Sequence, residues 1–291
     1  MQNSSDRNGR ALEYAVVVQL EQRLSPKKAR LTTRAVQSQL KDEQKYLSLS
    51  VYQQQQFQAW ANLVYDWLEA KFLISSQDLT IDRLADTDAR AGDPTDVRLE
   101  SSLQKINLSI KHNHKALKHQ RPASTAQHCG YSIKTPEDLQ FREQYQAVIK
   151  AFNVFTSGYS YFRDLETGIV SAHLYQPICE LVARSINLFC CYPEKANHLF
   201  RFLVSDTNFY KLILDLREQE LRIQPFHKPE FVDAVIAKNF RNYVHLDFSN
   251  AWRISMRLHT ASSRITINPN LKFDTQLDDQ TSIVEERLRI Q

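Results

Sequence analysis

The chain has 291 residues, a formal net charge of +4 at pH 7 and 24% charged residues, which is ordinary for a globular protein of one large or two small domains. It contains only five glycines and neither a Walker-type phosphate loop nor a dinucleotide-binding fingerprint, so the common nucleotide-binding motifs are excluded. The polar N-terminus MQNSSDRNGRALEY is not a signal peptide, and no apolar run is long enough to span a bilayer. We therefore expect a cytoplasmic protein without a membrane segment.

The cysteines give no sign of a metal site. They form no Cys-x-x-Cys pair and no Cys/His spacing typical of zinc, and a reducing cytoplasm would keep them as thiols. We expect all four to fill the core: Cys129, Cys179, Cys190 and Cys191.

The N-terminal quarter predicts three helices. Apolar residues recur every four positions within residues 9–24, which indicates an amphipathic helix. Residues 34–47 are polar and rich in glutamine, as in a solvated helix. Residues 51–74 carry large apolar side chains at helical spacing, so this helix should be packed and its Trp60 and Trp67 should belong to the core.

The pattern changes near residue 86. The sequence DTDARAGDPTD indicates a loop, because Gly, Pro and Asp favour turns. Two strands are then predicted, at residues 96–101 and 106–112. A basic segment, residues 111–122, follows and stops at Pro122.

The remaining chain alternates helical and strand patterns. Helices are predicted at residues 137–156, 172–191 and 194–204, and the region after residue 209 is rich in strand patterns: FYKLILDL, ELRIQPF, YVHLDFS, WRISMRLH, SRITI and LKFDTQL. We expect an α/β fold with a mixed sheet flanked by helices and a β-rich C-terminal part. It forms either one compact unit or a core with a C-terminal lobe.

Asp96, Ser109 and Lys111 form a candidate catalytic group. Asp96 begins the first predicted strand, whereas Ser109 and Lys111 stand two positions apart on the second and so share one face of it. Metal-dependent phosphodiester hydrolysis needs carboxylates that bind magnesium and a cation that acts on the attacking water. Two neighbouring strands could bring these three side chains together at one edge of the sheet. The alternative is a surface aspartate and a solvated lysine, which this pattern produces by chance in many chains.

The pattern PTD…SIK resembles that of the PD-(D/E)xK nucleases, with serine where those enzymes have an acid. Serine is a poor magnesium ligand, so a second carboxylate must come from elsewhere. Glu13 is the candidate, because NGRALEYA resembles the first helix of many such nucleases. Asp93 and Glu100 are weaker alternatives.

Four strings together resemble the HaeIII-type restriction endonucleases: GRALEYA (9–15), DVR (96–98), LSIKHNHKALKHQRP (108–122) and WRISMRLHTASSRITINPNLKFDTQL (252–277). The resemblance implies a type II enzyme that cuts duplex DNA at GGCC with Mg²⁺. It implies that Asp96 and Glu13 bind the metal, that Lys111 acts on water, and that Ser109 occupies the usual acid position.

The resemblance also sets the expected organisation of the chain. It implies a restriction-endonuclease-like fold over residues 1–291 as a single unit, with a nuclease core at about residues 1–160 and a β-rich, DNA-contacting part at about residues 205–291. A palindromic target would suit a homodimer, and a host would need a cognate DNA methyltransferase. Two alternatives remain open: a DNA-binding protein of nuclease ancestry that no longer cleaves, and a structure-selective repair nuclease on the same core.

A basic segment beside Lys111 is the first candidate DNA contact. Residues 105–121 contain five Lys or Arg residues and no acid. Basic side chains neutralise phosphates, and Asn or Arg can contact base edges. The candidates are His112, Asn113, His114, Lys115, Lys118 and Arg121. The alternative is a solvated basic helix.

The stretch 252–259 is the second candidate DNA contact. Its apolar residues alternate with polar ones, so the apolar face should be core. The polar face is either solvated or turned to DNA, where two arginines could each reach the O6 and N7 atoms of a guanine. The candidates there are Arg253, Arg257 and His259.

Overall fold

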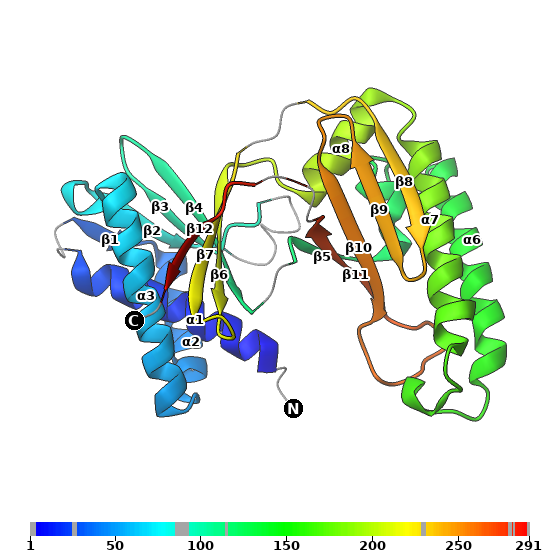
Figure 1. Ribbon diagram of the computed structural model, residues 1–291, viewed down its shortest axis with the longest axis horizontal. Helices are drawn as coiled ribbons and strands as arrows, with labels where there is room; N and C mark the ends of the chain where they lie inside the picture. The colour runs from blue at the N-terminus through cyan, green and yellow to red at the C-terminus, as the bar shows by residue number, and fades with distance from the viewer. Residues whose placement is uncertain are drawn as a thin grey trace. The chain divides into compact units, whose positions relative to one another are not determined.

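The computed structural model describes residues 4–24, 28–84, 93–113, 116–227, 231–278, 281 and 283–289. The chain divides into two compact units, which Figure 1 shows as separate groups of elements. The first unit comprises residues 1–115, 207–228 and 283–291, and the second comprises residues 116–206 and 229–282. The chain therefore leaves the first unit twice and returns twice. The first unit and the expected core of about residues 1–160 have residues 1–115 in common.

The first unit is built on a mixed seven-stranded sheet of order β1-β2-β3-β4-β6-β7-β12. The β1–β2 and β4–β6 pairs are parallel and the other pairs are antiparallel, which confirms the predicted mixed sheet. The strands are β1 (Ala29–Leu31), β2 (Leu79–Arg83), β3 (Val97–Glu100), β4 (Lys105–His112), β6 (Phe209–Asp215), β7 (Glu220–Phe226) and β12 (Glu286–Arg289).

Three helices and a short 3₁₀ turn accompany this sheet: α1 (Ser4–Arg23), α2 (Thr33–Leu47), α3 (Val51–Phe72) and η1 (Ile74–Ser76). The Thr32 side chain caps α2, and Ser50 with Gln53 forms a capping box at the start of α3, which satisfies backbone groups that a helix end leaves unpaired. The core lies between α1, α3 and one face of the sheet. Trp60 is fully buried and Trp67 nearly so, as predicted.

The second unit contains a five-stranded antiparallel sheet of order β5-β11-β10-β9-β8. Its strands are β5 (Lys118–Gln120), β8 (Val235–Phe240), β9 (Tyr243–Phe248), β10 (Arg253–Thr260) and β11 (Leu271–Leu277). Its helical elements are η2 (Pro122–Ser124), α5 (Thr125–His128), α6 (Pro136–Asn153), η3 (Val154–Thr156), η4 (Phe162–Asp164), the π-helical η5 (Ser171–Tyr175), α7 (Gln176–Phe189) and α8 (Pro193–Leu203). Helix α7 packs on β8 and β9, and α6 packs on α7 (Figure 1).

The predicted SRITI strand was wrong. This segment forms only an isolated bridge, from Arg264 to Tyr161, because its side chains stay largely outside the core and Ile267 is 80% exposed. The alternative of a basic helix does not hold for the described residues either, since β4 runs through His112 and β5 begins at Lys118.

The described part of the chain has no helix long and apolar enough to cross a membrane. The cysteines are all free thiols. Three of them are buried as predicted, whereas Cys191 is exposed.

Candidate active site

Asp96 lies beside Ser109 because of the register between β3 and β4. Val97 is opposite Leu108, and the Asp96 amide donates to the Leu108 carbonyl at 2.8 Å. The apolar neighbours on β4 therefore point into the core while Asp96 and Ser109 share the other face. The turn before β3 thus holds the carboxylate at the end of an interior strand. The predicted place at an edge of the sheet was wrong, because β3 and β4 are the third and fourth of its seven strands.

The Asp96 carboxylate is anchored through a single oxygen. Its Oδ2 atom accepts from the Ile110 amide at 2.6 Å, from Lys111 Nζ at 3.0 Å and from Ser109 Oγ at 3.4 Å. No described group donates to Oδ1. The Asp96 and Lys111 side chains are 20% and 26% exposed, so solvent reaches this ion pair. The structure therefore brings the three predicted polar groups together and leaves one carboxylate oxygen available.

Glu13 points toward this group rather than into solvent. The residue is 6% exposed, and its Oε2 atom accepts from Arg83 and, at 3.0 Å, from Arg10. Burial raises the pKa of the Glu13 carboxyl, and the negative charge of Asp96 raises it further. The positive charges of Arg83, Arg10 and Lys111 oppose that shift. Glu13 and Asp96 are therefore close enough to repel each other.

Arg83 is the residue of this site that the sequence analysis missed. It ends β2, and the next amide, that of Leu84, donates to the Asp96 carbonyl at 3.1 Å. Its guanidinium is 1% exposed and also donates to Gln39 and Asp42, each at 3.0 Å. The signal was available, because Leu79, Ile81 and Arg83 alternate and put the arginine on the apolar face of β2.

A second missed residue is Lys211. Strand β6 pairs in parallel with β4 and places Lys211 directly beside Ser109. The lysine is 2% exposed and thus adds a buried cation to the row that begins with Asp96 and Ser109. Nothing in the local sequence shows that these two strands, about a hundred residues apart, are neighbours.

The alternative carboxylates are engaged elsewhere. Asp93 accepts from Arg98 and from Thr95, whose amide lies 3.1 Å from Oδ1, so it caps the turn before β3. Glu100 stands at the other end of β3, exposed, with its nearest cation Lys105 at 3.9 Å. The pair that remains is Asp96 and Glu13.

The donors of this pair suit a hard divalent cation. Asp96 Oδ1 and Glu13 Oε1 accept no hydrogen bond from any described residue, and two carboxylates that repel each other favour a cation between them. Magnesium is commonly held by one or two carboxylates and keeps several waters. The described residues contain no group of three His, Cys, Asp or Glu side chains that could hold a metal, so water would have to supply the other ligands.

The first-unit residues of the basic segment hold the end of β4. The His112 ring stacks edge-on against Phe57 at 5.4 Å, and burial lowers the pKa of His112. Asn113 has a φ of 54°, donates its amide to the Leu214 carbonyl and accepts the Leu216 amide on its side chain, each at 2.8 Å. His114 and Lys115 lie outside the described residues.

The second-unit residues of the basic segment bond within their own unit. Lys118 Nζ donates to the Phe202 carbonyl at 2.8 Å and lies 3.8 Å above the Phe202 ring. Burial lowers the pKa of Lys118 to about 8. Arg121 donates to the Leu271 carbonyl at 3.3 Å. The Lys118 ammonium therefore has a packing role, whereas Arg121 stays exposed.

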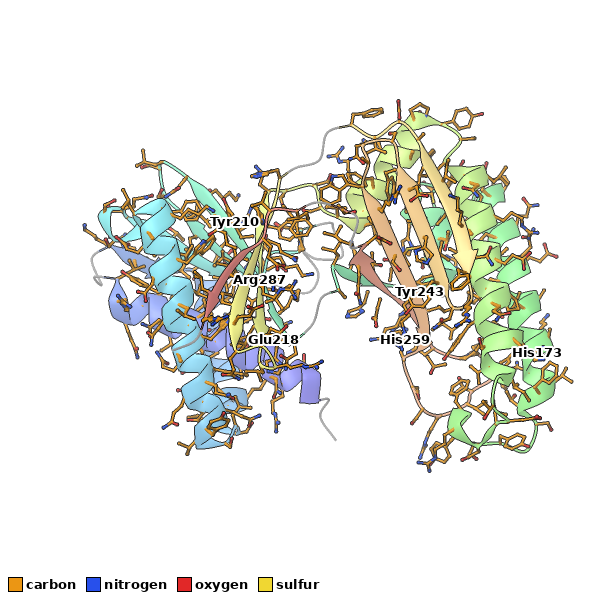
Figure 2. The ribbon with its side chains drawn as sticks, viewed as in Figure 1. His173, Tyr210, Glu218, Tyr243, His259 and Arg287 are labelled. Carbon is orange, nitrogen blue, oxygen red and sulfur yellow. The ribbon has the colours of Figure 1, made fainter. Side chains whose placement is uncertain are left out.

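Strand β10 has the apolar and the polar face that the sequence predicts. Ile254, Met256 and Leu258 are buried, and the alternate residues point to the other side of the sheet. Figure 2 labels His259 on this strand and Tyr243 on its neighbour β9. Arg253 and Arg257 are both exposed, which makes this face accessible to a large partner.

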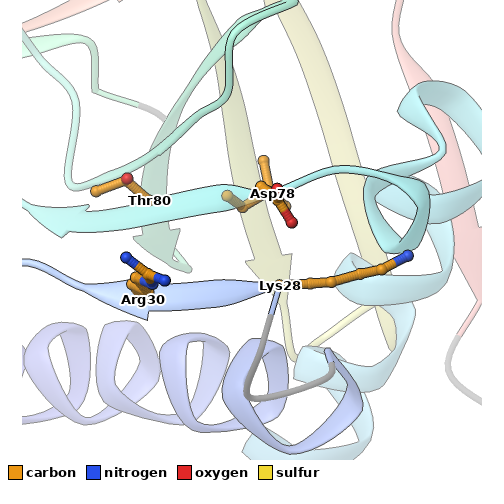
Figure 3. A pocket seen from close by; sticks show the side chains of 5 residues that line it. Lys28, Arg30, Asp78 and Thr80 are labelled. Atoms are coloured by element: carbon orange, nitrogen blue, oxygen red, sulfur yellow. The ribbon is translucent and has the colours of Figure 1, made fainter.

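A separate small cavity lies between β1 and β2 (Figure 3). Its volume is about 220 Å³, and it is lined by Lys28, Arg30, Asp78, Leu79 and Thr80. Lys28 and Arg30 belong to the β1 side of this cavity, and its other residues are at the start of β2, whereas Arg83 is at the end of β2. The cavity therefore does not belong to the candidate active site.

The comparisons with known proteins match most of the chain. The model of the HaeIII restriction endonuclease family matches residues 9–228 and 222–279. The type II restriction enzyme HaeIII of Haemophilus aegyptius is 24% identical over 309 positions, which cover 95% of this chain and 95% of that enzyme. No solved structure matches the chain significantly.

These matches first define a class: the protein is a restriction endonuclease, a hydrolase that cleaves double-stranded DNA at specific sites. The chain belongs to the HaeIII restriction endonuclease family. The resemblance found in the sequence is thereby confirmed.

Proposed function

We propose that this enzyme cleaves double-stranded DNA at a short GC palindrome by magnesium-dependent hydrolysis, with GGCC as the first sequence to test. The observation that carries the proposal is the Asp96–Lys111 ion pair at 3.0 Å, which lies within electrostatic reach of the buried Glu13 carboxylate. Family membership supports the DNA substrate. The choice of GGCC comes from the resemblance described for the sequence.

Each residue of the site has a role in this proposal. Asp96 and Glu13 would hold the magnesium ion through their available oxygens, and the bound ion would supply positive charge to the scissile phosphate. Lys111 Nζ would orient the attacking water and stabilise negative charge in the transition state. Ser109 keeps the place of the second acid of a PD-(D/E)xK site and donates to Asp96.

The proposal extends to the partners of the enzyme. Arg253 and Arg257 on the exposed face of β10 would contact DNA, as the sequence pattern suggests, and Arg121 would add to the positive charge of that unit. A palindromic target would be read most simply by a homodimer, because each protomer would meet the same half-site. A host would protect its own sites with a cognate methyltransferase, and both enzymes would act on cytoplasmic DNA.

The decisive experiment is a digest of unmethylated phage DNA with the full-length enzyme, with and without Mg²⁺. A discrete fragment ladder that matches GGCC sites supports the proposal. DNA binding without cleavage would favour a protein that has lost its activity, and cutting restricted to branched DNA would favour a structure-selective nuclease. Either result would overturn the proposed function.

Variants then test the individual roles. Lys111→Ala is expected to lower the cleavage rate by roughly 10²-fold or more while DNA binding persists, because the lysine acts mainly in the transition state. Glu13→Gln should lose metal-dependent cleavage but still fold, because Arg83 keeps Asp42 as a charged partner at 3.0 Å, which thermal unfolding checks. Lys105→Ala is the matched control, since Lys105 is an exposed lysine on the same strand. Near-normal cleavage by Lys111→Ala would remove that residue from the mechanism.

A further inference from the structure

A row of polar side chains crosses the exposed face of the second sheet. His119 on β5 is opposite Asp274 on β11, Asp274 is opposite Arg257 on β10, and Arg257 is opposite Tyr243 on β9. Side chains directly opposite each other on neighbouring antiparallel strands share a face and lie close together. An arginine and an aspartate in this relation ordinarily form a cross-strand ion pair.

Asp274 is engaged by other residues. One carboxylate oxygen lies 2.6 Å from His119 Nδ1, and the other lies 3.1 Å from His259 Nε2. Burial alone would raise the pKa of Asp274, but the nearby imidazoles of His259 and His119 and the charge of Lys272 outweigh it and lower that pKa. Asp274 is therefore an ionised carboxylate whose two oxygens both face histidines.

Arg257 is left available as a consequence. Its side chain is exposed and forms no hydrogen bond or ion pair with any described residue. Arg253, two positions earlier on the same face, shows the usual outcome, because its guanidinium lies 3.4 Å from Asp247 on the adjacent strand. The two arginines that the sequence made equivalent are thus distinguished by their neighbours.

We propose that His119 and His259 keep Asp274 away from Arg257, so that the Arg257 guanidinium is presented to duplex DNA. His259 is then a positioning residue and not a DNA contact. The inference rests on the proposed contact between the β10 face and DNA. Its physical advantage is that DNA would not have to break an ion pair to reach Arg257.

The test measures DNA binding by fluorescence anisotropy with a labelled GGCC duplex, in EDTA so that no cleavage occurs. Arg257→Ala should weaken binding about tenfold to a hundredfold, as expected for one lost arginine contact. His119→Ala with His259→Ala should weaken it to a similar extent, because Asp274 becomes free to pair with Arg257. Adding Asp274→Asn to that double variant should restore binding, since the competing charge is gone.

The salt dependence of binding distinguishes the two DNA groups that an arginine can contact. If Arg257 binds a phosphate, Arg257→Ala and the double histidine variant lower the slope of log K against log salt by about one, equally on any duplex. If it contacts a guanine edge, both variants lose preference for GGCC over a mismatched duplex while the slope stays the same.

Failure of the inference and failure of the proposed contact give different results. Normal binding by Arg257→Ala removes the proposed contact itself. Weak binding by Arg257→Ala together with normal binding by the double histidine variant, or no restoration by Asp274→Asn, overturns the positioning role. Thermal unfolding checks that each variant is folded. If the double variant is not, His119→Ala alone serves, because that side chain is 46% exposed and lies closest to Asp274.

Discussion

Replacing Arg83 with methionine should destabilise the first unit severely. The side chain is 1% exposed and donates to Glu13, Asp42 and Gln39, which come from two different helices. Methionine fills similar space but leaves two buried carboxylates without their shared cation. Removing one partner of a buried ion pair costs about 3–5 kcal/mol, because the remaining charge is uncompensated. Glu13 keeps Arg10 at 3.0 Å and Asp42 keeps Lys45 at 3.6 Å, so the lower part of that range is expected.

Urea denaturation followed by tryptophan fluorescence measures this loss, since Trp60 and Trp67 both belong to the first unit. The matched control is Arg23→Met, which removes an exposed pair with Asp66 at 2.9 Å and should cost less than about 1 kcal/mol. A decrease of under about 1 kcal/mol in the free energy of unfolding of Arg83→Met would refute the reasoning. It would mean that the buried carboxylates are hydrated or protonated in the variant at little cost. Arg83→Lys should recover only part of the stability, since a lysine cannot present a planar fork to several acceptors.

Three further predictions concern the rest of the chain. Asp96→Ala should abolish cleavage in a digest whereas Asp93→Ala should keep it, because the Asp93 carboxylate caps the turn before β3. Burial lowers the pKa of His128 to about 3, so between pH 6.5 and 3 only the unfolded chain binds a proton at this residue. The free energy of unfolding should therefore fall as the pH drops through this range, by at most about 1.4 kcal/mol per pH unit. Urea titrations of His128→Gln should show a flatter dependence on pH. Gly130→Ala should lower the melting temperature more than Gly158→Ala, because both glycines have positive φ but only at Gly130 would a Cβ atom lie 2.9 Å from another side chain. Calorimetry of the two variants checks this order, and the opposite order of melting temperatures would contradict it.

The elements that the sequence predicts well are those whose burial follows a regular period. Helices α1 and α3 bury one or more faces at helical spacing, and β10 alternates strictly between core and surface. In such segments the packing of the folded state and the local pattern agree, so the pattern alone predicts the element.

Of the missed strands, β2 and β8 do alternate and could have been recognised, whereas the others lack a period long enough to recognise. Strands β1 and β5 have three residues each, and their pairing depends on partners distant in the chain. Strand β12 (Glu286–Arg289) has Leu288 as its single apolar residue, and side chains of another element hold it, since Trp67 and Lys71 donate to Glu286. The converse error, the predicted SRITI strand, shows that alternation without burial does not make a strand.

The residues of the candidate site also differ in how far the sequence alone predicts them. Asp96, Ser109 and Lys111 could be predicted together because β3 and β4 are consecutive and antiparallel, so that a short link fixes their register. Glu13 came from the family resemblance and not from its own pattern, since a glutamate beside an apolar stripe is usually an exposed flank residue. Arg83 and Lys211 depend on strand neighbours that only the folded chain reveals.

The position of Lys211 gives a physical reason for the serine at position 109. The register places the two residues side by side on parallel strands, and Lys211 is buried. A carboxylate at position 109 would face this ammonium group and pair with it, so that its charge would be less available to a metal ion. In the proposed site, Glu13 on α1 would supply the second carboxylate instead. That carboxylate is paired through its Oε2 atom with Arg83 and Arg10, which leaves Oε1 available. Arg83 is itself held by Asp42 and Gln39, so the buried arginine would stabilise the buried glutamate that the proposal requires.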